Sequence, residues 1–417
     1  MARKPHFSKN ILSFFVLSVL FLQTVVFAAE NDFTSKTYLK YFQDPTDKNF
    51  APLYEYVELE SRNLHKGQVS LYLSGWLGHD FNALQYDKRT RDELTYAMVR
   101  FSPYTDRRLL LTAGRQFVFE GVASEQLDGI AARWELTPSA GFSLFGGAPV
   151  ETEFDSRGGD AVSGGRMFFR IQNKGEIGLS VLDEVNDGKR FREEGGVDLW
   201  LLPVKKGEVK GQSSYNNITE GWREHSYTLR VFAAERLTLS GLFAQSRYDD
   251  AFSVRTLSAF SPEFIGIGER LTKQGGGVDY RATDNLSGVA DYVHYDYRLM
   301  GDADYYGARV SYTVSGIMTG LSLHRMDGAV DKLRYIETRV YAATDLEDWR
   351  LSLDAINLNY DSAFNNVKNA YSLNGTVRYK INDSLTSGFS VDYARTPDFV
   401  HNTTALLNLV YGYKSGR

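Results

Sequence analysis

Apolar and polar side chains alternate along most of this chain, from residue 54 to residue 413, in segments of about ten residues separated by turns. In one such segment Val377 and Tyr379 share one face, whereas Thr376 and Arg378 share the other. A period of two places successive side chains on opposite faces of a β-strand. The pattern therefore predicts an all-β protein with one apolar and one polar face. Such a sheet belongs either to a soluble sandwich or to the wall of a transmembrane barrel.

The start of the chain differs from the rest. A basic stretch around Arg3 and Lys4 precedes an apolar run at residues 11–22 and two small residues at 28–29. This order is typical of a secretory signal peptide, and we interpret residues 1–29 as a cleaved signal rather than a retained anchor helix. No later stretch approaches the ~18 continuous apolar residues of a transmembrane helix. Any membrane insertion must therefore use strands.

Three features favour the membrane barrel over the soluble sandwich: the secretion signal, the absence of cysteine and the number of consecutive strand pairs. The mean hydropathy is only -0.33 although 43% of residues are hydrophobic, as expected when alternate side chains face lipid. The 26 tyrosines suit aromatic girdles at the two membrane interfaces. We predict a transmembrane antiparallel up-and-down β-barrel in the outer membrane of a Gram-negative bacterium, in contact with outer-membrane lipid.

Short and long connections alternate along the chain, as expected for short periplasmic turns and longer external loops. The predicted longer connections include residues 117–125, 183–194 and 361–367. Because bacterial barrels have an even number of strands, the alternation predicts about 22 strands, with roughly 20 or 18 as alternatives. The barrel proper is predicted at residues 51–413. A first strand at residues 33–42 would lie in an N-terminal segment, residues 30–50, and residues 414–417 form a C-terminal tail.

A barrel of this width encloses a lumen that wall side chains cannot fill. TonB-dependent transporters fill theirs with a globular plug, but only about twenty mature residues precede the first clear strand here, which argues against a plug. The longest connection, residues 248–273, contains Phe252, Phe260 and Phe264. It either folds inward as a constriction or packs outside on its neighbours. The other way to fill the lumen is a separate protein.

Composition excludes several classes of function. Without cysteine the chain cannot form disulfides, thiolate metal sites or covalent c-type haem attachments. The formal net charge of -5 and the absence of a basic run argue against nucleic-acid binding. We therefore expect no cofactor of its own, and any redox group must belong to a partner.

No motif for enzymatic chemistry stands out. His324 and Ser322 share one face of a predicted strand, and His294 lies near Asp291, but no third catalytic group accompanies either histidine. The run at residues 155–160 lacks the spacing of a calcium loop and suits a solvated turn. We predict a protein without enzymatic activity, with no catalytic residue and no metal site.

The polar faces of the strands supply the candidate pore-lining residues. Both charge signs are present in similar number, so an open pore would be only weakly ion selective. Two of the arginines, Arg166 and Arg170, lie about 14 Å apart on one strand face. They either line a constriction or pair with acidic neighbours and brace the wall. The candidates are Arg133, Arg166, Arg170, Arg230, Arg309, Arg350, Arg378, Asp198, Asp279, Asp354 and Asp392, with Glu135, Glu176 and Lys380 on the same faces.

One hairpin carries a resemblance to known proteins. Residues 109–135 read LLLTAGRQFVFEGVASEQLDGIAARWE. An AGRQ strand end, a loop and an LDG strand start resemble a hairpin of bacterial porin-like and alginate-export-like outer-membrane barrels. The match covers this hairpin alone, so it implies the barrel class and not a substrate. The last strand departs from the pattern, because residues 414–417 follow its terminal aromatic residue. The matching residues are Gly114, Arg115, Gln116, Asp128 and Gly129.

The overall plan, a wide and sparsely looped barrel, also resembles the barrel component of porin-cytochrome electron conduits. In those complexes a multihaem c-type cytochrome sits in the lumen and the barrel itself carries no haem. The leading prediction is an outer-membrane channel that passes small hydrophilic solutes or ions. The alternative is the barrel sleeve of an electron-transfer complex with a cytochrome partner, and the weakest alternative is an outer-membrane hydrolase.

Overall fold

The computed structural model describes residues 30–43, 48–82, 90–104, 106–150, 159–204, 206–247, 268–397 and 401–415. The predicted signal peptide lies outside these ranges, as do residues 248–267 of the longest predicted connection and most of the run 155–160. Within the described ranges the chain is almost entirely β-strand. None of the helices in these ranges is long and apolar enough to cross a membrane.

The strands follow one another along the chain with a single helical turn, α2 (Leu64–Gly67), and a short 3₁₀ turn, η1 (Asp331–Leu333). They are β1 (Glu30–Gln43), β2 (Asn49–Phe50), β3 (Pro52–Asn63), β4 (Val69–Asp80), β5 (Thr90–Phe101), β6 (Leu109–Glu120), β7 (Ala123–Thr137), β8 (Ala140–Pro149), β9 (Ala161–Ile171), β10 (Gly175–Asn186), β11 (Lys189–Val204), β12 (Gly207–Asn216), β13 (Gly221–Ala234), β14 (Leu237–Arg247), β15 (Arg270–Arg281), β16 (Leu286–Tyr297), β17 (Gly301–Val314), β18 (Ile317–Gly328), β19 (Tyr335–Leu346), β20 (Trp349–Phe364), β21 (Val367–Lys380), β22 (Leu385–Arg395) and β23 (Asn402–Ser415).

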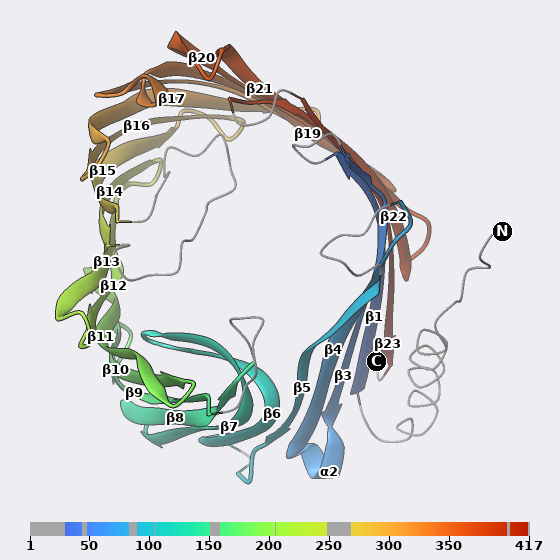
Figure 1. Ribbon diagram of the computed structural model, residues 1–417, viewed down its shortest axis with the longest axis vertical. Helices are drawn as coiled ribbons and strands as arrows, with labels where there is room; N and C mark the ends of the chain where they lie inside the picture. Colours follow the sequence, from blue (N-terminus) through green and yellow to red (C-terminus); the bar gives the residue numbers. More distant parts are fainter. Residues whose placement is uncertain are drawn as a thin grey trace.

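The sheet closes on itself (Figure 1). Each long strand runs antiparallel to the next, and β1 pairs with β3 on one side and with β23 on the other. The two-residue β2 pairs only with β1, so the 23-stranded sheet of the described residues is a closed barrel of 22 strands. This confirms the predicted fold class and strand number. Closure removes both sheet edges, which a bilayer would otherwise leave without hydrogen-bond partners.

The first and last strands meet over most of their length. Asn31 lies opposite Ser415 and Phe42 opposite Thr404. The strand at the start therefore begins at Glu30 and covers the stretch in which a first strand was predicted. At the other end β23 continues past the terminal aromatic residue to Ser415.

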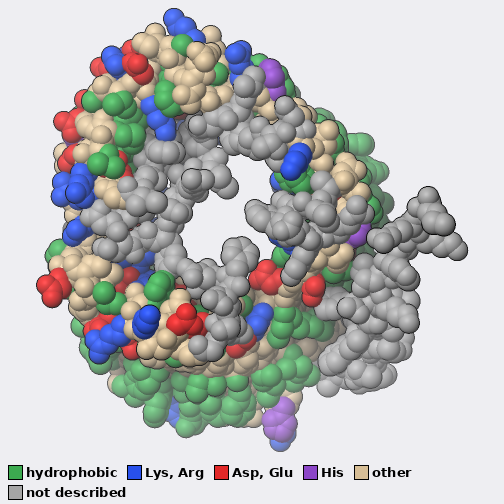
Figure 2. Space-filling model, viewed as in Figure 1, with side chains coloured by type: hydrophobic (Ala, Val, Ile, Leu, Met, Phe, Trp, Pro, Cys, Tyr) green, Lys and Arg blue, Asp and Glu red, His purple; other side chains and the backbone are tan. Residues whose placement is uncertain are grey.

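The outer face of the barrel is apolar, because every second side chain points to it. Leu144, Met167 and Val181 on neighbouring strands are 56%, 52% and 62% exposed, whereas Phe168 on the opposite face is fully buried. Apolar side chains cover much of the outer wall (Figure 2). The predicted alternation is thus that of a barrel wall, in which the apolar residues lie on the outer face towards lipid.

The inner face is less uniformly polar than the alternation predicts. Two clusters of buried apolar side chains lie on it, both towards the barrel end that carries the longer connections, which we call the loop end. One cluster includes Tyr297, Met326 and Leu358, and the other includes Leu127 and Leu182. Inner-face apolar residues are buried only where another part of the chain covers them, so the second cluster points to a segment that folds inward.

Three connections predicted to be long are tight turns. β6 reaches Glu120 and β7 begins at Ala123, where a loop at residues 117–125 was expected. The predicted connections at 183–194 and 361–367 are likewise mostly strand, with turns at residues 187–188 and 365–366. Their polar residues continue the strands beyond the apolar band, which sequence alternation alone does not reveal.

Candidate lumen site at the inward hairpin

The hairpin of β6 and β7 leaves the barrel wall. β6 pairs with β5 only from Leu111 to Arg115, and β7 pairs with β8 only from Leu127 onwards. Beyond these points the two strands pair with each other alone. Residues 116–126, which we call the inward hairpin, lie on the lumen side of the wall formed by β8 to β11 (Figure 1).

Glycine permits the bend. Gly114 has a φ of 113°, and a Cβ at this position would lie 2.2 Å from the carbonyl oxygen of Ala97 on β5. On the partner strand, a Cβ at Gly129 would lie 2.2 Å from the carbonyl oxygen of Gly146. Both strands therefore make their closest approach to the wall at positions where only glycine fits. Beyond these positions they turn inward.

Polar side chains hold the base of the hairpin. The Arg115 guanidinium donates to both carboxylate oxygens of Asp128, over 2.7 and 2.8 Å. It also donates to the carbonyl oxygen of Leu94, and the Gln126 amide donates to that of Thr95. At this level β5 pairs with β4 on one side, but its ladder with β6 has ended on the other. Arg115 of the AGRQ segment and Gln126, which precedes the LDG segment, thus link the hairpin to β5 by side-chain hydrogen bonds.

The inward hairpin covers an apolar part of the inner wall. Val118 and Leu127 pack with Phe145, Val162 and Leu182, all buried, from β8, β9 and β10. On a wall facing open water these side chains would be exposed, so the hairpin removes their surface from solvent. Burial of apolar area favours the docked position by about 25 cal/mol per Å².

The hairpin tip is held by hydrogen bonds to the wall. The backbone N–H of Val122 donates to the Ser180 hydroxyl over 3.0 Å. Arg192 forms ion pairs with Glu125 of the hairpin, at 2.5 Å, and with Glu194 of β11, at 2.6 Å. All three of these charged side chains are at most 17% exposed. Arg192 therefore ties the hairpin to the wall through a largely buried pair of carboxylates.

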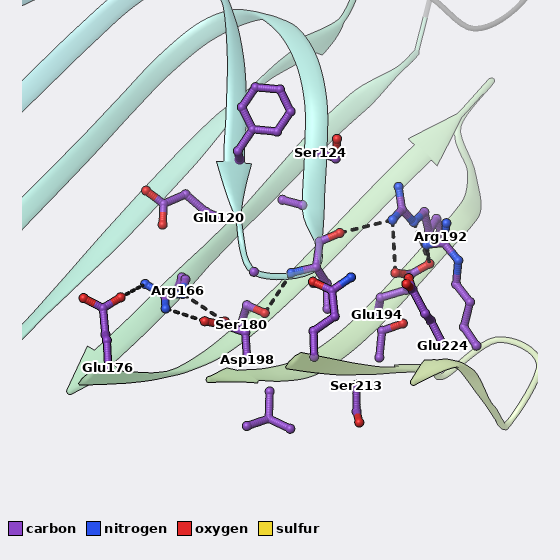
Figure 3. A pocket seen from close by; sticks show the side chains of 18 of the residues that line it. Glu120, Ser124, Arg166, Glu176, Ser180, Arg192, Glu194, Asp198, Ser213 and Glu224 are labelled. Atoms are coloured by element: carbon purple, nitrogen blue, oxygen red, sulfur yellow. Dashed lines mark hydrogen bonds and ion pairs between the residues drawn. The ribbon is translucent and has the colours of Figure 1, made fainter. Parts of the chain in front are cut away.

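A second charge network lies beside the tip on the inner face (Figure 3). Arg166 donates to Glu176 over 2.8 Å and to both carboxylate oxygens of Asp198. Arg170 donates to Glu135 over 2.9 Å and to Glu176 over 3.0 Å. Both arginines therefore pair with acidic neighbours, as one of the two interpretations expects. That they line a constriction stays a prediction.

The same arginines surround an aromatic ring. Phe168 is fully buried, and the guanidinium carbons of Arg133 and Arg170 lie 4.4 and 4.9 Å from its centroid. Arg133 also forms an ion pair with Glu120 at the hairpin tip, at 3.2 Å. Cation–π contacts and ion pairs together fix the arginine side chains in place.

A cavity of about 540 Å³ lies between the hairpin tip and the wall. Its lining carries both charge signs and one exposed ring. Phe119 is 72% exposed and stacks on Phe117, with centroids 6.1 Å apart. Representative lining residues are Phe119, Arg133, Glu176, Gln212, Arg223 and Glu224.

The other candidate pore-lining residues are spread around the inner face. Arg350 pairs with Asp345, and Asp354 pairs with Arg339. The Asp392 carboxylate lies 3.5 Å from the Asn374 amide. A further group forms no ion pair with another described residue and is exposed on the inner face: Arg230, Arg309, Arg378 and Asp279. The structure thus brings Arg133, Arg166, Arg170 and Asp198 together, and the other candidates lie apart from this group. The role of all these residues in lining a pore stays a prediction.

The histidines singled out in the sequence have structural partners. His324 is 8% exposed, stacks on Tyr305 with centroids 4.8 Å apart, and its Nε2 lies 3.2 Å from Asp291. His294 pairs with Asp304, at 2.9 Å. Among the described residues, no group of three or more His, Cys, Asp or Glu side chains is arranged to hold a metal ion.

Sequence reasoning missed the inward hairpin. It treated the segment as an external loop and placed its candidate constriction at residues 248–273, most of which lie outside the described residues. A signal was present, because Gly114 and Arg115 on one strand face Asp128 and Gly129 on the next. Without the partner strands, nothing indicated that these residues end the pairing to the wall.

Comparisons with known proteins bear on the fold. No protein-family model matches the chain, and no curated protein matches it. Among solved structures it is similar to a mutant of the ferric enterobactin receptor PfeA from Pseudomonas aeruginosa, with a TM-score of 0.59 and 10% identity over 92% of this chain and 80% of that one. It is also similar to the siderophore receptor PirA from Acinetobacter baumannii, with a TM-score of 0.59 and 9% identity over 92% of this chain and 80% of that one.

A structure of OccAB4 from Acinetobacter baumannii matches less well, with a TM-score of 0.47 and 11% identity over 93% of this chain and 98% of that one. At such identities the likeness to the two receptors concerns the fold alone. Together with the closed sheet and its apolar outer face, it gives the chain the architecture of an outer-membrane β-barrel. The inner face of this barrel carries a hairpin docked by a charge network.

Proposed function

We propose that the protein is a porin-like channel of the bacterial outer membrane that passes small hydrophilic solutes or ions. The ring of strands surrounds an open centre (Figure 2), and its outer face suits lipid. The inward hairpin narrows the lumen from the side of β8 to β11. The barrel itself needs no catalytic group for this role, and none is proposed.

The observation that carries the proposal is the docked hairpin. It is anchored at its base by Arg115 and Asp128 and at its tip by Arg192. A wide barrel needs something in its lumen to restrict passage. Among the described residues, a hairpin fixed to one wall narrows the lumen without crossing it, which suits a channel. A sleeve around a cytochrome partner would instead need that space for the partner.

Planar-bilayer recording of the purified mature chain tests the proposal. The expected result is stable, open single channels, together with uptake of small sugars but not of larger oligosaccharides in liposome swelling. Purification from the native organism supplies the second measurement. A barrel that conducts no ions and copurifies with c-type haem absorbance would replace the channel by the electron-transfer sleeve.

A further inference from the structure

Four aromatic side chains lie together on the barrel wall formed by β1, β3 and β4. β5 separates this part of the wall from the inward hairpin. Tyr38 of β1 lies opposite Tyr54 of β3, and Tyr56 of β3 lies opposite Trp76 of β4. Ring centroids of neighbouring members are 5.5 to 6.4 Å apart. We call Tyr38, Tyr54, Tyr56 and Trp76 the inner aromatic patch.

The patch faces the lumen and not the lipid. Leu39 follows Tyr38 on β1, and Leu73 lies three residues before Trp76 on β4. Each leucine is therefore on the face opposite the patch residue, and each is 40% exposed on the outer face. The patch side chains are half-buried, so each keeps part of its surface accessible on the inner face. Inner positions of a wide barrel are normally polar. Aromatic surface that is exposed to water on the inner face is unfavourable in itself, and exposed apolar patches mark binding sites.

The ring geometry selects the kind of solute. Tyr38 and Tyr56 meet at 87°, Tyr54 and Trp76 at 68°, and Tyr56 and Trp76 at 34°. The rings therefore form no continuous flat platform. They offer edges beside faces, and edge-to-face contact is a preferred arrangement for an added aromatic ring.

The rim of the patch selects an uncharged solute. The Trp76 indole N–H donates to Glu93 over 3.0 Å, and Lys36 forms an ion pair with Glu58 at 3.2 Å. The neutral indole does not offset the Glu93 charge, but the charges of Arg91 and Asp80 also act on Tyr54, so the rim carries both signs. A charged solute of either sign would therefore meet like charge there, whereas the polar groups of the rim can exchange hydrogen bonds with a hydroxyl group.

The backbone makes room for the patch. A Cβ at Gly78 would lie 2.7 Å from the ring of Tyr54, which lies opposite it on β3. Only glycine lets that ring lie flat against β4. The ring positions are therefore set by the wall as well as by one another.

We propose that the inner aromatic patch binds small, uncharged aromatic solutes that carry a hydroxyl group. This rests on the proposed channel and names a class of solute for it. The rings of the patch contact the ring of the solute, and the polar rim accepts or donates a hydrogen bond to its hydroxyl.

Tryptophan fluorescence tests the site. The variant W134F/W200F/W222F/W349F, with Trp76 as its single tryptophan, is placed in lipid nanodiscs and titrated with 4-nitrobenzyl alcohol, an uncharged aromatic quencher. We expect saturable quenching that benzyl alcohol competes away. Cyclohexylmethanol and glucose should compete at least about fivefold less well, since they lack the aromatic contacts. Equal competition by either of them, or quenching that never saturates, would overturn the proposal.

Tyr56→Leu in the same background should weaken the quencher's affinity about fivefold. Its matched control is Tyr312→Leu, which removes a tyrosine that is 45% exposed on the outer face. Gly78→Ala supplies a second variant, in which Tyr54 must move. Retained affinity in both patch variants would contradict the site.

Channel recording separates the two proposals. Conducting channels with no saturable quenching would remove the aromatic site and leave the channel standing. Saturable quenching in a barrel that conducts no ions would remove the channel and leave an aromatic site in a closed lumen.

Discussion

Arg115 of β6 and Asp128 of β7 form a two-point ion pair at the level where the inward hairpin leaves the wall, with N–O distances of 2.7 and 2.8 Å. Two parallel hydrogen bonds fix the orientation of both side chains. Before Arg115, β6 pairs with β5, and beyond it β6 pairs only with β7. The pair therefore marks the hinge of the hairpin and links its position in the lumen to the wall.

Asp128→Ala should loosen the hairpin and enlarge the passage. Removal of the carboxylate leaves the Arg115 guanidinium without its two-point partner, so the hairpin loses its fixed angle at the base. We expect higher and noisier single-channel conductance than in the wild type, measured in planar bilayers at the same salt concentration.

The matched control is Asp361→Ala. Asp361 also pairs with an arginine through both carboxylate oxygens, Arg325 of β18, and this pair is not among the candidate pore-lining residues. Its loss should leave the conductance near that of the wild type. Equal conductance in both variants and the wild type would mean that the hairpin does not limit the passage.

Arg166→Ala should destabilise the barrel by about 3 kcal/mol, because loss of one member of a buried ion pair leaves the other charges uncompensated. The Arg166 side chain is 9% exposed, and its partners Glu176 and Asp198 are about a quarter exposed. Thermal unfolding of the detergent-solubilised barrel, followed by heat-dependent gel mobility and circular dichroism, measures the effect.

Arg350→Ala controls for the loss of an arginine. Its side chain is 62% exposed and that of its partner Asp345 is 66% exposed. An ion pair this open to water contributes about 0–1 kcal/mol. Similar melting temperatures for the Arg166 and Arg350 variants would show that the network beside the hairpin tip does not stabilise the fold.

Gly114→Ala should disturb the bend of β6. The φ of 113° is strained for any residue with a side chain, at about 1–3 kcal/mol, and the added Cβ would clash with the carbonyl oxygen of Ala97. We expect a lower yield of folded barrel and a conductance change in the same direction as for Asp128→Ala. Gly375→Ala, where a Cβ meets nothing within 4 Å, should refold like the wild type.

The barrel could be predicted because the alternation of apolar and polar side chains is a local property of each strand. Alternation along a strand, as at Val377 and Arg378, reports the two faces directly, and turn residues mark the ends. Closure then follows, since a bilayer tolerates no open edge. The strand number was accessible for the same reason, once the weakly alternating stretch that became β1 was counted.

The lumen could not be predicted in the same way. Phe117 and Val118 alternate as in any strand, and nothing in that local pattern tells whether the strand continues the wall or bends into the lumen. That depends on contacts between distant segments, such as Val122 with Ser180 and Glu125 with Arg192. Tyrosines pose the same problem, because they suit the membrane interfaces by composition, yet those of the inner aromatic patch face the lumen.

Charge reversal of unpaired arginines should make the channel cation selective. Both signs line the inner face, so the wild type should give a reversal potential near zero in a tenfold KCl gradient, against about 59 mV for a perfectly selective pore. Arg230, Arg309 and Arg378 are exposed there and form no ion pair with another described residue. Their joint replacement by glutamate therefore adds negative charge without breaking an ion pair within the described structure.

We expect the triple variant to shift the reversal potential towards that of a cation-selective pore. The shift should grow as the salt concentration falls, because the Debye length rises from about 10 Å at 0.1 M to about 30 Å at 0.01 M. Lys206→Glu, in the exposed turn between β11 and β12, reverses a charge outside the strands and should leave the potential unchanged. If the triple variant behaves like this control, ions do not pass along the wall on which these arginines lie.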